Sequence, residues 1–162
     1  MTLTRISVLL ATLLLASCGF TLRGTADLPR ALQPLYLENV NDSTPMGREL
    51  RRTLLINKVA LADKLQANGY SLSVGNESSS ERALSVNSNA RAGEYEVIMT
   101  VPYQLKKGGA SVQPQQSVSI GKVYVADPEN AVAKTEEANI IRDEMRSEIS
   151  QQILRRLQAY KP

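Results

Sequence analysis

Residues 94–106, Glu-Tyr-Glu-Val-Ile-Met-Thr-Val-Pro-Tyr-Gln-Leu-Lys, decide how the rest of the chain is read, because their side chains alternate with the two-residue period of a β-strand. This is the clearest strand signal in the sequence. Lys107-Gly108-Gly109-Ala110 follows it and predicts a hairpin connection, and residues 112–125 predict the returning strand. One side of the first strand carries Tyr95, Val97, Met99, Val101 and Tyr103.

Upstream of this hairpin, shorter segments also predict strands. Residues 35–40, Leu-Tyr-Leu-Glu-Asn-Val, are rich in strand-forming residues and predict the first strand. Residues 70–74 begin a second strand, residues 75–81 form a polar excursion, and alternation resumes at residues 83–86. We interpret this region as one strand interrupted by a loop or bulge, and residues 87–93 as a turn.

A first helix is predicted from Thr44, as N-cap, and Pro45, at the first helical position, where its missing N–H costs nothing. The predicted helix runs to about Gln66 and ends near Asn68-Gly69, a common C-terminal signal. The apolar side chains that recur at helical spacing are Met46, Leu50, Leu54, Leu61 and Leu65.

A second, long helix is predicted after the hairpin, with Asp127 as N-cap and Pro128 at its first position. Simple core packing against the sheet is the favoured interpretation of its apolar stripe. That stripe consists of Ala131, Ala138, Ile141, Met145, Ile149, Ile153, Leu157 and Tyr160.

The order of these elements predicts an α+β fold, with two helices packed on one face of a roughly four-stranded, mostly antiparallel sheet. Residues 34–162 are expected to form this single domain. The other face of the sheet must then be polar or covered by another molecule. Apolar or half-apolar side chains occur on both sides of the hairpin strands, which favours a partner surface.

The N-terminal residues predict where the protein resides. They have the layout of a secretory signal that ends in a bacterial lipobox. This layout consists of the basic Arg5, an apolar run over residues 6–15, and the sequence Leu15-Ala16-Ser17-Cys18-Gly19. Cys18 is the predicted lipidation site, residues 1–17 the signal peptide and residues 18–33 a lipidated tether. An ordinary leader with a chance cysteine is the alternative, and a membrane span is disfavoured because the apolar run is about ten residues where about twenty are needed.

The composition excludes several function classes. Removing residues 1–17 leaves 145 of the 162 residues and a net charge near +2, which is too slight to indicate nucleic-acid binding. The sequence has no histidine and a single cysteine, so metal, thiol and disulfide chemistry lack their usual residues. No nucleophile elbow, dinucleotide fingerprint or phosphate-binding loop is present. We therefore predict no enzymatic activity, no metal and no cofactor beyond the covalent lipid on Cys18.

Three separated segments resemble one known family. They look like segments of the lipopolysaccharide-assembly lipoprotein family, LptE, also called rare lipoprotein B. The segments are Cys18-Gly19-Phe20-Thr21-Leu22-Arg23-Gly24, residues 94–101, and Asp127-Pro128-Glu129-Asn130-Ala131-Val132-Ala133-Lys134. The resemblance implies two helices on a four-stranded sheet. It also implies a non-enzymatic subunit of the outer-membrane lipopolysaccharide translocon, lipid-anchored on the periplasmic side, that plugs the β-barrel partner LptD, assists its assembly and binds lipopolysaccharide.

The resemblance also implies two basic positions for lipopolysaccharide binding. Lys134 matches one of them. At the other, this sequence has Ser88, and the nearest basic residue is Arg91, a substitute by proximity only. A solvated surface charge is the alternative for both residues.

Two competing functions remain open on the sequence alone. One is a free-standing periplasmic lipoprotein that binds envelope lipid or cell wall without any barrel, and the other is a lipoprotein hydrolase. Co-purification with a barrel protein distinguishes the first from a translocon subunit, and a pocket with convergent carboxylates and serine would indicate the second.

Overall fold

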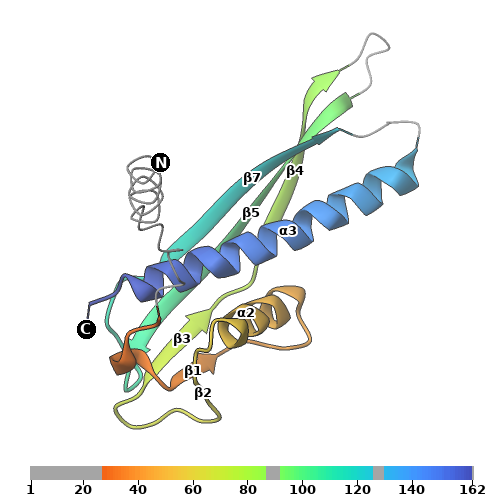
Figure 1. Cartoon of the computed structure of the whole chain (residues 1–162). Helices are drawn as coiled ribbons and strands as arrows, with labels where there is room; N and C mark the ends of the chain where they lie inside the picture. The colour runs from red at the N-terminus through yellow and green to blue at the C-terminus, as the bar shows by residue number, and fades with distance from the viewer. Residues whose placement is uncertain (1–26, 87–91, 126–129, 162) are drawn as a thin grey trace, which may run out of the picture.

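The computed structural model describes residues 27–86, 92–125 and 130–161, which form one elongated layer of sheet with two helices on one face (Figure 1). The helical elements are η1 (Arg30–Leu32), α2 (Pro45–Ile56) and α3 (Ala131–Gln158). The strands are β1 (Leu35–Glu38), β2 (Leu61–Ala62), β3 (Tyr70–Val74), β4 (Ser78–Val86), β5 (Ala92–Lys107), β6 (Ala110–Ser111) and β7 (Gln116–Val125).

Strand β5 is the centre of the sheet. Its residues 94–103 pair with β7 on one side, and its residues 92–100 pair with β4 on the other. Strand β3 continues the β4 side, because it pairs antiparallel with residues 103–107 of β5. Strand β1 then pairs parallel with both β3 and β2. The sheet is mixed and mostly antiparallel, and the predicted α+β class is confirmed.

The predicted interruption between β3 and β4 is a β-bulge. Val74 lies opposite Tyr103 and Ser78 opposite Thr100. The chain therefore advances four positions from Val74 to Ser78 while β5 advances only three between Thr100 and Tyr103, which leaves one extra residue on the β3–β4 side. The Gly75 N–H donates to the Pro102 carbonyl at 2.9 Å, which keeps the ladder continuous through the bulge. The two strands therefore behave as one interrupted strand, as predicted, but the predicted extent of the interruption, residues 75–81, is wrong, because β4 begins at Ser78 and residues 78–81 pair with β5.

The core lies between the sheet and the two helices. Alternation along β5 buries Val97, Met99, Val101, Tyr103 and Leu105 on the helical side, as predicted. Helix α2 contributes Met46, Leu50 and Leu54, and α3 contributes Met145, Ile149, Ile153 and Leu157. Burying a side chain of this size contributes about 1.5–3 kcal/mol each, so these inward rows hold the two layers together.

The prediction that the first helix reaches Gln66 is wrong, because α2 ends at Ile56. Lys58 adopts a left-handed conformation at φ 58°. The Val59 N–H donates to the Leu54 carbonyl at 3.0 Å and the Lys58 N–H to the Leu55 carbonyl at 2.9 Å, which is a Schellman motif. Leu61 then joins β2 opposite Leu35 of β1.

The start of the second helix also differs from the prediction. Helix α3 begins at Ala131, and the Asn130 side chain accepts a hydrogen bond from the Ala133 N–H at 3.0 Å. Asn130, not Asp127, is therefore the N-cap, and the predicted first residues of this helix, 127–129, lie outside the described residues.

The segment predicted as a tether contains packed residues at its end. Leu28 and Leu32 are both buried in the core cluster, and the Gln33 side chain joins this segment to the domain by donating to the Leu28 carbonyl and accepting from the Ala60 N–H. The packed part of the chain thus begins before residue 34. Within the ranges that the structure describes, no helix has the length and apolarity that a membrane crossing requires.

Candidate functional site

The two halves of α3 meet the sheet through different chemistry. The C-terminal half buries Met145, Ile149 and Ile153, whereas the preceding two turns bury only Ala138. The N-terminal half instead lies over acidic side chains of the β4 region. Glu81 of β4 pairs with Val97 of β5, and directly opposed residues point to the same face, so the Glu81 carboxylate faces the helix.

Glu81 brings together two basic side chains of α3. Its Oε1 atom lies 2.8 Å from the Lys134 Nζ atom, and its Oε2 atom lies 3.5 Å from the Arg142 Nη2 atom. Lys134 also sits over the Tyr95 ring, 3.9 Å from its centroid, which is a cation–π contact. We call Glu81, Tyr95, Tyr124, Lys134 and Arg142 the seam cluster. Its two cations and one carboxylate give it a formal charge of +1.

The proton equilibria of the seam cluster follow from these contacts. Burial alone would raise the pKa of the Glu81 carboxyl, but hydrogen bonding from Lys134 and the charge of Arg142 outweigh it, so that pKa is lowered. The hydrogen bond to Glu81 raises the pKa of Lys134. Burial and the neighbouring Glu81 carboxylate raise the pKa of Tyr124 to about 12. Lys134 is therefore charged, and Tyr124 is neutral, at neutral pH.

Two aromatic rings support the cluster from the sheet. Tyr95 of β5 and Tyr124 of β7 are cross-strand partners, and their rings stack with centroids 5.5 Å apart. Tyr124 is buried, and the Tyr95 ring carries the Lys134 ammonium. Helix α3 and strands β4, β5 and β7 thus all contribute side chains to the positively charged seam cluster.

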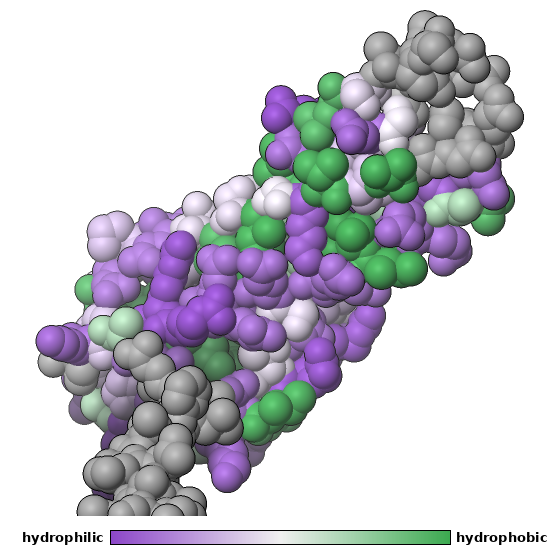
Figure 2. Space-filling view, turned by 45° about the horizontal axis from the view of Figure 1, so that its top comes forward, coloured by the Kyte–Doolittle hydropathy of each residue, from purple (hydrophilic) through white to green (hydrophobic). Residues whose placement is uncertain are grey.

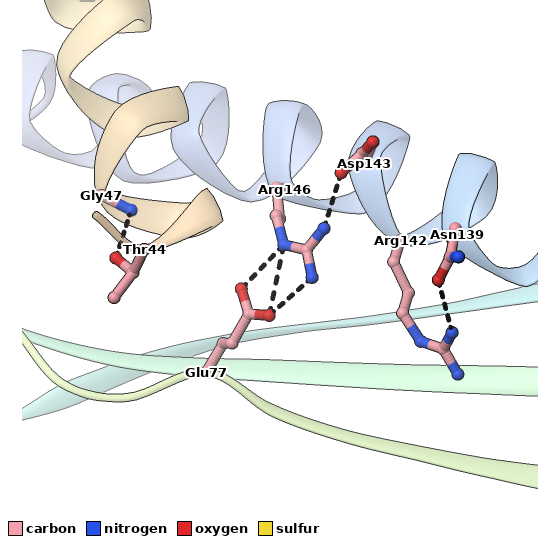
Figure 3. A network of polar contacts seen from close by, with 7 residues as sticks. All are labelled: Thr44, Gly47, Glu77, Asn139, Arg142, Asp143 and Arg146. Atoms are coloured by element: carbon pink, nitrogen blue, oxygen red, sulfur yellow. Dashed lines mark hydrogen bonds and ion pairs between the residues drawn. The ribbon is translucent and has the colours of Figure 1, made fainter. Parts of the chain in front are cut away.

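A second ion-pair group lies further along α3 (Figure 3). Arg146 forms a bidentate pair with Glu77, with nitrogen–oxygen distances of 2.7 and 2.9 Å, and also contacts Asp143 at 2.6 Å. The hydrogen bond to Glu77 raises the pKa of Arg146. Lys122 of β7 pairs with Glu144 at 2.9 Å. These pairs fix α3 against the sheet where the apolar packing ends.

The outer surface of the same part of the molecule is apolar in places. The large exposed apolar side chains of the sheet are Leu84, Val123 and Val125, and those of α3 are Val132 and Ile140. Val125 is 73% exposed to solvent and Val132 is 74% exposed. Figure 2 shows hydrophobic surface gathered toward this end of the molecule. We call these five residues the distal apolar set. They lie on both layers of the domain.

Of the sequence-predicted site residues, only Lys134 lies among the described residues. Arg91 and Cys18 lie outside them. The sequence did not indicate Glu81, Tyr95 or Arg142 as partners of Lys134. The spacing of Lys134, Ala138 and Arg142 by four residues places them on one helix face and was a usable signal, but the acidic partner required the register of β4.

Metal-ligand geometry is absent from this part of the chain: no group of three or more His, Cys, Asp or Glu side chains among the described residues could hold an ion.

Two solved structures of bacterial lipoproteins share this architecture. The crystal structure of rare lipoprotein B from Shewanella oneidensis matches with a TM-score of 0.69 and 26% sequence identity, over 77% of this chain and 93% of that one. The solution structure of lipoprotein B from Nitrosomonas europaea also gives a TM-score of 0.69, at 22% identity, over 87% and 91% of the two chains, and so supports the fold alone. The class is an α+β lipoprotein domain of the rare lipoprotein B type.

The sequence comparisons give the family. The LptE model, described as lipopolysaccharide-assembly, matches residues 32–157. The LPS-assembly lipoproteins LptE of Yersinia pestis and Yersinia pseudotuberculosis are each 34% identical over 149 residues, which is 91% of this chain and 72% of theirs. This chain belongs to the LptE family.

Family membership confirms the resemblance and the function class that it implied. The protein is an outer-membrane lipoprotein of lipopolysaccharide assembly, and its family is not enzymatic. The hydrolase alternative is thereby set aside.

Proposed function

We propose that this chain is the lipoprotein subunit of the outer-membrane lipopolysaccharide translocon. It lies as a plug inside the LptD barrel, assists assembly of that barrel, and binds lipopolysaccharide through the seam cluster. Acyl chains on Cys18 hold it at the membrane. Within the cluster, Lys134 is the principal phosphate ligand. Arg91, which is not among the described residues, adds a further cation.

The observation that carries the barrel proposal is the distal apolar set. A domain with one flat partner needs one apolar face, but here exposed apolar side chains lie on the sheet, at Val123 and Val125, and on the covering helix, at Val132 and Ile140. A wall that surrounds this end of the domain removes both surfaces from water, at about 25 cal/mol per Å2 of apolar area buried. A free-standing lipoprotein would leave both surfaces exposed.

Electrostatics support lipopolysaccharide as the ligand. Lipopolysaccharide phosphates are held by cations, and ammonium and guanidinium groups replace them through charge-assisted hydrogen bonds. Lys134 and Arg142 share one carboxylate, so the cluster keeps a formal positive charge for an anion. The Lys134 side chain is 30% exposed, so part of it reaches the surface of the domain.

The barrel proposal is tested by mild-detergent extraction of the full-length chain from outer membranes and identification of the proteins that co-purify. The double variant Val123→Gln/Val125→Gln should lose co-purification of the LptD barrel. The matched control Leu55→Gln/Ile56→Gln changes two apolar side chains of α2, 55% and 66% exposed, and should retain it. Recovery of the wild-type chain without any barrel protein would refute the proposal in favour of the free-standing alternative.

A further inference from the structure

Ion pairing divides the basic side chains of this molecule into two sets. Eight of those in the described part of the chain form ion pairs: Arg51, Arg52, Arg82, Lys106, Lys122, Lys134, Arg142 and Arg146. The other eight have no acidic partner among the described residues: Arg48 and Lys58 lie in the first turn of α2 and just after its last residue, and the remaining six are all exposed. These six lie in η1, the β2–β3 loop, the last residue of β5, and the last turn of α3 with the residues after it, toward the end of the domain at which the C-terminus lies (Figure 1). We call these six the basic end: Arg30, Lys64, Lys107, Arg155, Arg156 and Lys161.

Contacts from four segments hold the basic end together. Lys107 lies over the Tyr70 ring, 5.1 Å from its centroid, and Tyr70 meets Tyr160 edge-on at 6.3 Å. The Gly108 N–H donates to the Gly69 carbonyl at 2.9 Å, so the β5–β6 turn is fixed to the loop that carries Lys64. Arg156 donates to the Ser117 carbonyl at 3.0 Å. Lys107 and Arg156 are thus held by contacts with neighbouring segments.

The negative charge at this end is small. Asp27 and Asp63 are the acids of the neighbouring described segments, and Glu38 is already paired with Lys106. A surface with several unpaired cations attracts an extended anionic surface, to which each basic residue adds a roughly similar increment. A single small anion would need a concave site, and these residues project from the outside of four segments.

The chain also enters the domain at the basic end. Leu28 and Leu32 pack into the core beside η1, and Cys18 precedes Asp27 by nine residues. A fully extended chain of that length spans at most about 30 Å. If acyl chains on Cys18 are in a bilayer, the end of the domain that carries Arg30 must stay within that distance of the headgroups. This step rests on the lipidation in the proposed function.

We infer that the basic end is a docking surface for the anionic phospholipid headgroups of the membrane in which the chain is anchored. It orients the domain before assembly with a partner, with the basic end on the bilayer and the seam cluster and distal apolar set directed away from it. The occupant is the phospholipid bilayer, and the recognition is between ammonium or guanidinium groups and lipid phosphates.

The test uses the mature chain from residue 18 with Cys18→Ser, so that no acyl chain contributes. Among the described residues, the buried core cluster runs from Leu28 to Leu157, and the mature chain contains all of it. Co-sedimentation with vesicles of phosphatidylethanolamine and phosphatidylglycerol should show binding that weakens as salt is added. Vesicles of phosphatidylcholine alone should bind little.

The triple variant Lys64→Gln/Arg155→Gln/Lys161→Gln should bind the anionic vesicles roughly a hundredfold more weakly, because three surface cations are lost. The matched control Arg51→Gln/Arg52→Gln/Arg82→Gln removes the same charge elsewhere and should bind within about twofold of the parent. Equal weakening by both variants, equal binding to phosphatidylcholine, or no binding at all would overturn the inference.

A binding measurement with lipopolysaccharide distinguishes the two possible sources of phosphate, which are phospholipid headgroups and lipopolysaccharide. Purified lipopolysaccharide should bind the triple variant as it binds the parent, and loss of that binding with vesicle binding unchanged would overturn the inference. Failure here leaves the proposed function intact, because lipidation and barrel association are measured separately, by the mass of the mature protein and by co-purification.

Discussion

Replacing Gly47 by alanine separates a sequence argument from a structural one. Gly47 lies in the first turn of α2, and by helix propensity alone Gly→Ala should stabilise the protein by up to about 1 kcal/mol. In the structure, a Cβ atom at this position would lie 2.1 Å from the Asn41 carbonyl oxygen and 2.8 Å from the Thr44 Oγ1 atom. Both neighbours belong to the N-terminal cap, so relief of the overlap must disturb that cap.

The cost follows from what the cap contains. Thr44 Oγ1 donates to the Asn41 carbonyl at 2.7 Å and accepts from the Gly47 N–H at 3.1 Å, and the Thr44 N–H donates to the same carbonyl at 3.0 Å. Loss of an N-cap costs about 1 kcal/mol, and overpacking costs about 1–3 kcal/mol. After subtraction of the propensity gain, Gly47→Ala should lower the free energy of unfolding by about 1–3 kcal/mol.

Urea denaturation of the unlipidated mature chain, followed by far-ultraviolet circular dichroism, measures this change as a lower midpoint with an unchanged slope. Gly93→Ala is the matched control, because a Cβ there meets nothing within 4 Å. It should be neutral or stabilising by up to about 1 kcal/mol. If Gly47→Ala is as stable as the parent or more so, the close approach of the β1–α2 loop to the helix is wrong.

Three further outcomes are expected. The pKa of Glu81 is lowered in the folded state, so its ion pairs stabilise the fold above the ordinary carboxyl pKa of 4.5, and this contribution is lost as pH falls through the folded-state pKa. The difference in free energy of unfolding between wild type and Glu81→Gln should therefore shrink on acidification, as measured by chemical denaturation at a series of pH values. Lys134→Gln should weaken lipopolysaccharide binding in a direct binding assay while changing stability by less than about 1 kcal/mol, and unchanged binding would remove Lys134 from the site. In detergent phase partitioning, Cys18→Ala should move the chain from the detergent fraction to the aqueous fraction without unfolding it, because each buried acyl CH2 contributes about 0.8 kcal/mol to anchoring. Retention in the detergent fraction would contradict lipidation at Cys18.

Some features of the fold are local and were therefore readable from the sequence. The period of two in residues 94–106 and the Gly108-Gly109 turn predicted the β5 hairpin, and both glycines adopt positive φ. Thr44 and Pro45 predicted the start of α2, since capping involves residues three apart. The family resemblance, carried by motifs in chain order, was likewise available from residues alone.

Other features depended on contacts between distant segments. Leu61 and Leu65 continue the helical spacing of α2, yet the chain leaves the helix at Lys58 because residues 61–62 pair with β1, a long-range gain that local propensity does not record. Lys134 was recognised as a site residue from sequence, but its partner Glu81 lies 53 positions away and reaches it only through the register of β4 on β5.

The sequence by itself determined the strand–helix–strands–helix order, the β5 hairpin and the family, because periodicity, turn residues and motifs act between near neighbours. Only the tertiary structure decided where α2 stops, which carboxylate holds Lys134, and which cations remain unpaired at the basic end. These depend on strand register and helix placement, which bring together charges that the chain keeps far apart.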